Sequence, residues 1–187
     1  MPSDLILAVK ERVSHSTLPP PLSDKAIADV ESRLGFALPQ LLRELYQYVG
    51  NGGFGPGYGI LSLDEDRNGD YSALTLYLGN HADYPHLPLW KWPTGLLEFC
   101  DWGCGITSCV DCIHPPNPVL TFEYVQGPME CSFAPTRDSL ESWLRDWLAG
   151  KNVYESVYEK APELDTVIIN PFTREPMVVK GRKPRRR

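Results

Sequence analysis

The chain has 187 residues, of which 42% are hydrophobic and 11% are aromatic, a content that fits one globular domain and excludes a disordered or fibrous chain. Its formal net charge of −6 is unevenly distributed, because residues 180–187 hold six basic residues, whereas residues 1–179 carry 12 basic against 24 acidic ones, a net charge of −12. This acidic body disfavours nucleic acid as a partner and favours a basic molecule.

The first third of the chain predicts three amphipathic helices, because apolar residues recur there at helical spacing. The predicted ranges are 3–15, 24–34 and 39–49. Ser23 is placed to cap the second helix, and Gly35 follows it where a left-handed residue would end it. Pro39 suits the first residue of the third helix, because an N–H at that position would have no partner within the helix. A proline-rich connector at residues 18–21 separates the first two helices.

The composition changes abruptly after residue 50. Five glycines between residues 52 and 59 indicate backbone at positive φ or in close approach. They lack the Gly-Lys-Ser/Thr ending of a phosphate-binding loop, so we interpret them as a sharp reversal that leads into a short strand at 60–63. Residues 71–78 fit either a helix or a strand, and residues 84–93 are expected to form an irregular loop rich in proline and aromatic side chains.

The second half of the chain predicts a sheet followed by one helix. Strands are expected at 96–101, 105–111 and 119–124. Thr136 is interpreted as the cap of a tryptophan-containing helix that ends before Gly150, and apolar density falls beyond it. The predicted organisation is a helix and connector at 1–21, a domain at 22–150, and an extension with a mobile basic tail at 151–187.

Neither the apolar stretches nor the N-terminal residues predict a membrane or secreted protein. No run of about 18 apolar residues occurs, and the first residues have neither the basic nor the apolar part of a secretory signal. Five cysteines, an odd number, do not suggest a disulfide framework in a chain of this length. We therefore expect a cytoplasmic protein with reduced thiols and no membrane partner.

Four cysteines lie within 13 residues, at Cys100, Cys104, Cys109 and Cys112. Their chemistry suits zinc, which binds four thiolates in a tetrahedron. Their spacing argues against it, because structural zinc sites pair two short cysteine knuckles across a longer element, whereas these four lie in two predicted strands whose side chains alternate between faces. We expect buried thiols, no metal and no cofactor, and we keep a zinc-binding or thiol-dependent enzyme module as the alternative.

The remaining reactive side chains form no pattern typical of catalysis. The four histidines, at positions 15, 81, 86 and 114, stand in no nucleophile context. The acidic residues at 64–66 and 70 do not continue as a calcium-binding loop, so a solvated loop or an acidic binding face explains them better. The basic tail is interpreted as a solvated end, with nucleic-acid contact as the weaker option.

Three motifs occur in an order that resembles a known family. The first is Glu31-x2-Leu34-Gly35-x2-Leu38-Pro39-x2-Leu42-x2-Leu45-Tyr46, followed by Asn51-Gly52-Gly53. The second is Phe99-Cys100-Asp101-Trp102-Gly103-Cys104-Gly105, and the third is Ser139-Leu140-x2-Trp143-Leu144-x2-Trp147-Leu148. Together they resemble the SUKH superfamily, the Smi/Knr-like domain, over about residues 20–150.

This resemblance implies an α+β fold in which a twisted, mostly antiparallel sheet is covered by helices, with no catalytic residues. It also implies protein binding, as in bacterial immunity proteins that neutralise toxins, many of them nucleases, or in fungal scaffolds for signalling and cell-wall assembly. An acidic body suits a basic toxin domain as partner. Loop aromatics beside carboxylates suit such an interface, with packing at the sheet edge as the alternative. The candidate partner-binding residues are Phe54, Tyr58, Asp64, Glu65, Asp66, Asp70, Trp90 and Trp92.

Overall fold

The computed structural model of the protein describes residues 2–64, 71–82, 91–124, 129–157, 166–169 and 176–179. The helices are α1 (Asp4–Arg12), α2 (Asp24–Leu34), α3 (Gln40–Tyr48), α4 (Ala73–Asn80) and α5 (Leu140–Leu148), with a 3-10 turn at Met129–Ser132. The strands are β1 (Gly59–Ile60), β2 (Leu96–Gly103), β3 (Ile106–Asp111), β4 (Val119–Phe122), β5 (Phe133–Arg137), β6 (Thr166–Ile169) and β7 (Pro176–Val179).

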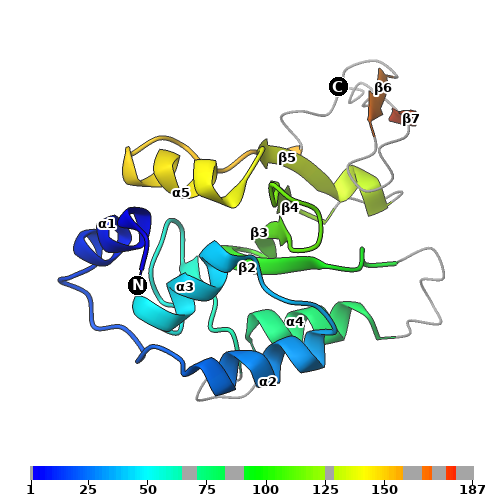
Figure 1. Cartoon of the computed structure of the whole chain (residues 1–187). Helices are drawn as coiled ribbons and strands as arrows, with labels where there is room; N and C mark the ends of the chain where they lie inside the picture. The colour runs from blue at the N-terminus through cyan, green and yellow to red at the C-terminus, as the bar shows by residue number, and fades with distance from the viewer. Residues whose placement is uncertain are drawn as a thin grey trace.

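Strands β1 to β5 form one antiparallel sheet in the order β1-β2-β3-β4-β5, and β6 pairs with β7 in a separate antiparallel sheet. Every neighbour in the larger sheet is also the next strand in the chain, so the sheet is a meander. With five helices around it, the sheet confirms the predicted α+β fold (Figure 1).

Helices pack on this sheet in two connected groups (Figure 1). Helices α1, α3 and α5 contact one another, whereas α4 lies against β2 and is covered in turn by α2. In the core, the Phe99 ring of β2 meets the Trp143 ring of α5 edge to face, with 5.1 Å between centroids. Tyr46 of α3 is fully buried and donates its hydroxyl to the carbonyl of Leu61 at 3.0 Å. These contacts fix the helices on the sheet.

The first two helices are confirmed. The N-cap of α2 is Ser23, whose hydroxyl accepts from the amide of Ala26 at 3.2 Å, and Gly35 follows the helix at φ 82°. Pro39 is the N-cap of α3 and not its first residue, so the helix begins at Gln40, one residue later than predicted. The ambiguous segment is helix α4, because Ser72 forms a capping box with Thr75 that fixes the first turn.

The prediction that Thr136 caps a helix is wrong. Thr136 belongs to strand β5, and its buried hydroxyl lies 3.1 Å from that of Thr121 on β4. Helix α5 begins at Leu140, where Ser139 and Ser142 form the capping box. Strands β5, β6 and β7 were not predicted; β5 pairs with β4, and β6 pairs with β7. Within the described ranges, no helix is both long and apolar enough to cross a membrane.

Candidate partner-binding surface

The hairpin between β2 and β3 ends in a tight turn with an unusual backbone. Gly103, Cys104 and Gly105 all have positive φ, at 84°, 54° and 75°. Because Gly103 pairs with Ile106, the turn consists of Cys104 and Gly105 alone. A two-residue hairpin turn of type I′ requires both of its residues to have positive φ. The turn therefore exposes Cys104 at the end of the sheet.

The ring of Tyr58 lies over this turn. Tyr58 is 77% exposed, and its amide donates to the carbonyl of Asp101 at 2.9 Å. A Cβ atom at Gly103 would lie 2.5 Å from the Tyr58 ring, so the ring rests on bare backbone. The glycine-rich segment thus positions an exposed aromatic side chain against the hairpin.

Trp102 extends the aromatic surface from Tyr58 toward Tyr154. Its indole Nε1 donates to the hydroxyl of Ser108 at 2.9 Å, and its ring centroid lies 5.3 Å from that of Tyr154. Gly57 approaches the same indole so closely that a Cβ there would lie 2.8 Å from it. We call Tyr58, Asp101, Trp102 and Tyr154 the hairpin-tip surface.

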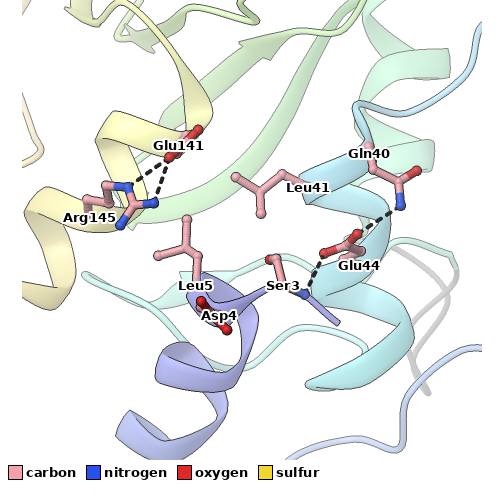
Figure 2. A pocket seen from close by; sticks show the side chains of 8 residues that line it. All are labelled: Ser3, Asp4, Leu5, Gln40, Leu41, Glu44, Glu141 and Arg145. Atoms are coloured by element: carbon pink, nitrogen blue, oxygen red, sulfur yellow. Dashed lines mark hydrogen bonds and ion pairs between the residues drawn. The ribbon is translucent and has the colours of Figure 1, made fainter. Parts of the chain in front are cut away.

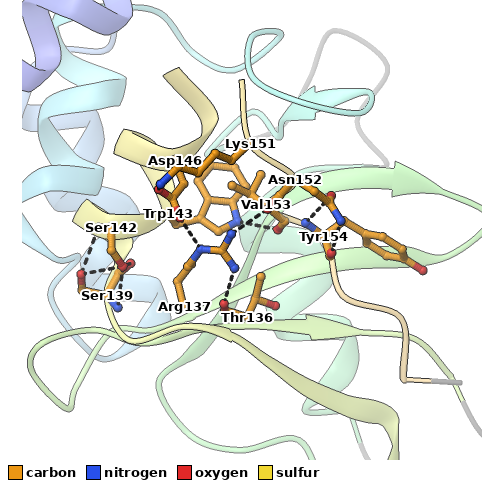
Figure 3. Close-up of polar contacts among 10 residues, drawn as sticks. All are labelled: Thr136, Arg137, Ser139, Ser142, Trp143, Asp146, Lys151, Asn152, Val153 and Tyr154. Atoms are coloured by element: carbon orange, nitrogen blue, oxygen red, sulfur yellow. Dashed lines mark hydrogen bonds and ion pairs between the residues drawn. The ribbon is translucent and has the colours of Figure 1, made fainter. Parts of the chain in front are cut away.

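Tyr154 is held in place by a network that follows helix α5 (Figure 3). Arg137 donates to the carboxylate of Asp146 at 2.8 Å and to the carbonyl of Asn152 at 2.6 Å. The Trp143 indole donates to the carbonyl of Val153 at 3.0 Å. The Asn152 side chain then accepts from the Tyr154 amide at 3.0 Å and donates to the Tyr154 carbonyl at 2.9 Å. The chain after α5 is therefore tied to the sheet before it reaches Trp102.

Asp64, the first residue of the acidic segment, is tied to the glycine-rich segment. The side chain of Asn51 donates to the Asp64 carboxylate at 2.7 Å and accepts from the Leu63 amide at 2.8 Å. A Cβ at Gly52 would lie 2.6 Å from the Ser62 amide nitrogen, so the two segments run in close contact. Asp64 is thus held beside the reversal that carries Tyr58.

The predicted partner-binding residues have different environments. Tyr58 is exposed and Asp64 is partly exposed, but Phe54 and Trp92 are only 4% and 5% exposed. Trp92 donates its indole N–H to the carbonyl of Leu96 at 2.7 Å and packs edge-on against the ring of Phe122. The structure therefore places Phe54 and Trp92 in the core, in agreement with the packing alternative. The other four candidates, Glu65, Asp66, Asp70 and Trp90, lie outside the described residues.

Trp102 and Tyr154 were not among the predicted partner-binding residues. In connection with function, Trp102 was named only within the family motif at residues 99–105, although a tryptophan between an acid and a glycine at the end of a strand is a usable signal. Tyr154 gave no signal, because it reaches Trp102 through tertiary contacts.

The four clustered cysteines do not converge. Cys100 and Cys109 project from opposite faces of the sheet, because Cys100 pairs with Ser108, the residue next to Cys109. Cys100, Cys109 and Cys112 are buried, and burial raises the pKa of each thiol. Among the described residues, no group of three or more histidine, cysteine, aspartate or glutamate side chains could hold a metal ion.

A buried carboxylate lies below the hairpin tip. Glu98 accepts a hydrogen bond from the Thr107 hydroxyl at 2.9 Å and another from the Asn80 side chain at 2.7 Å. Burial raises the pKa of Glu98, and these two hydrogen bonds partly oppose the shift. The pKa of Tyr71 is also raised, by burial and then by the charges of Asp101 and Glu98. Glu98 thus bonds both Asn80 of α4 and Thr107 of β3, so this carboxylate connects α4 to the sheet.

One comparison with known proteins gives a match. The model of a family described as SMI1 / KNR4 family (SUKH-1) matches residues 21–146. Comparisons with curated proteins and with solved structures found no match. The matched range contains helices α2 to α4 and the whole larger sheet, whereas α1 and Tyr154 lie outside it.

Proposed function

Because this chain belongs to the SMI1 / KNR4 family (SUKH-1), we propose that it is an immunity protein that neutralises a toxin through direct contact with a basic surface of that toxin. At the level of the family, a non-enzymatic immunity or SMI1/KNR4-like role is supported. The toxin, the basic character of its surface and the cytoplasmic location of the complex belong to the proposal.

The observation that carries the proposal is the hairpin-tip surface. Tyr58 is 77% exposed and its ring lies against Gly103, the residue after Trp102, whose own ring centroid lies 5.3 Å from that of Tyr154. Tyrosine and tryptophan contribute most to the binding energy of protein interfaces. These rings are also rigid, because close backbone approach at Gly57 and Gly103 and the hydrogen bond from Trp102 to Ser108 hold them. Pre-organised aromatic side chains lose little conformational entropy on binding.

Charge supports a basic partner. Residues 1–179 carry a net charge of −12, and the Asp64 carboxylate is held by Asn51 at the start of the glycine-rich segment. An arginine of the partner could lie on an exposed ring and reach a neighbouring carboxylate at the same time. Opposite charges on the two proteins also raise the association rate, and this increase becomes smaller as the salt concentration rises.

The test is co-purification from the native host with the full chain and its Tyr58→Ala variant as baits. Loss of a central aromatic anchor should weaken capture of a specific partner by about 30-fold or more. Ile113→Ala is the matched control, because Ile113 is a large exposed apolar residue that follows the far end of β3. Equal capture by wild type and Tyr58→Ala would refute the surface. Recovery of the chain alone at every salt concentration would refute the binding function.

A further inference from the structure

A pocket separate from the hairpin-tip surface lies between three helices. It has a volume of about 420 Å³ and lies where α1, α3 and α5 meet (Figure 2). The lining residues are Ser3, Asp4, Leu5, Gln40, Leu41, Glu44, Glu141 and Arg145. Helix α1 precedes the family-matched range, so the lining residues Ser3, Asp4 and Leu5 lie outside that range.

The rim of the pocket carries three carboxylates and one guanidinium. Arg145 is held by Glu141 at 2.7 Å, which leaves two further acidic residues on the rim. Glu44 accepts from the side chain of Gln40 at 2.9 Å, a neutral donor that does not cancel its charge. Among the residues that the structure describes, the Asp4 carboxylate has no ion pair. The rim therefore has a net negative charge.

The inner wall of the pocket is apolar. Leu5 is buried and Leu41 is partly buried, and both point toward the space between the helices (Figure 2). An acidic rim above an apolar wall matches a long basic side chain, which has an apolar stem and a cationic head. An anion would meet three carboxylates, and an apolar side chain would leave the Asp4 charge without a counterion.

We propose that this pocket binds an arginine or lysine side chain of a protein partner, with the stem on Leu5 and Leu41 and the cation between Asp4 and Glu44. None of the lining residues belongs to the hairpin-tip surface, so the pocket can bind whether or not that surface does. It would give a partner a second anchor, built in part from residues that precede the family-matched range.

The test is an NMR titration of the full chain with N-acetyl-arginine methylamide as probe. The amide signals of residues 4, 5, 41 and 44 should shift saturably. The uncharged citrulline analogue, which has nearly the same shape, should not shift them. Asp4→Asn and Glu44→Gln should each weaken binding by about two- to five-fold, the range of an exposed ion pair. Glu11→Gln, an exposed acid on α1 that does not line the pocket, should leave binding unchanged.

Four results would overturn the proposal. Equal shifts with citrulline would show that charge is not recognised, and shifts spread over the acidic surface without saturation would show only screening. The six basic residues of 180–187 can be changed to serine. If the arginine probe binds saturably only in that variant, the pocket of the wild-type chain is occupied by the chain's own tail. Inorganic phosphate in place of the arginine probe should leave these amides unshifted, and a saturable shift would identify an anion site instead.

Discussion

The two ends of the β2–β3 hairpin differ in burial, backbone and chemistry. In its stem, Cys100 and Cys109 are buried on opposite faces, so the stem is covered on both sides. At its tip, Cys104 is exposed on a left-handed backbone and Tyr58 lies on Gly103. A change in the stem must alter the core, whereas a change at the tip alters a surface that the core holds rigid. The same short segment therefore contains both core residues and part of the candidate partner-binding surface.

Thiol labelling should give the largest difference between stem and tip. Cys104 should react with iodoacetamide as an exposed thiol does, because nothing covers it among the described residues. Cys100, Cys109 and Cys112 should react at least about 1,000-fold more slowly, since their exposure requires an opening that costs several kcal/mol in a typical domain. Peptide mass spectrometry after timed quenching identifies each labelled residue.

Labelling in denaturant is the control, and all four thiols should then react at similar rates. Fast labelling of the stem cysteines after treatment with a chelator, but not before it, would contradict their role as core residues. It would support the zinc alternative, because metal release would then expose them.

The sequence predicts the parts of this hairpin that depend on local pattern. Two strand-like runs, at 96–101 and 105–111, predict the hairpin, whereas its turn is formed by Cys104 and Gly105, two residues later than the predicted turn at Trp102-Gly103. The faces of the cysteines followed from the alternation of side chains along these strands. Phe54 and Trp92 could not be assigned from their neighbours, because glycine and proline around an aromatic residue fit an exposed loop and a packed one equally well. Trp92, for example, packs against Phe122 of β4 and Phe133 of β5, which its neighbours in the sequence do not reveal.

Glycine substitutions at the tip should separate backbone strain from the position of Tyr58. Gly103→Ala and Gly105→Ala each place a Cβ on a left-handed backbone, so each should lower the free energy of unfolding by about 1–2 kcal/mol. Only the alanine at 103 meets the Tyr58 ring, because a Cβ at Gly105 has no neighbour within 4 Å. Denaturant titration measures the stability of both variants, and the ring signals of Tyr58 should move in Gly103→Ala alone.

Partner capture then sharpens the comparison. Gly103→Ala should weaken binding because it displaces Tyr58, and Gly105→Ala should bind as wild type does once both variants are shown to be folded. Equal losses in the two variants would mean that the turn backbone, and not the ring, contacts the partner.

The smallest effect is expected in the polar part of the stem, where Glu98→Gln should change stability by about 1 kcal/mol or less, the size of one rearranged hydrogen bond. The pKa of Glu98 is raised in the folded state by burial, so the folded protein holds this proton to higher pH than the unfolded chain does. Wild type should therefore lose stability relative to Glu98→Gln as pH rises from about 4, through the unfolded-state pKa, to the raised folded-state pKa. Above that pH the difference should be constant. Urea titrations of both proteins from pH 4 to pH 8 measure this difference in the free energy of unfolding. If the stability of the wild type rises relative to that of the variant as pH rises, the hydrogen bonds from Thr107 and Asn80 outweigh the cost of burial.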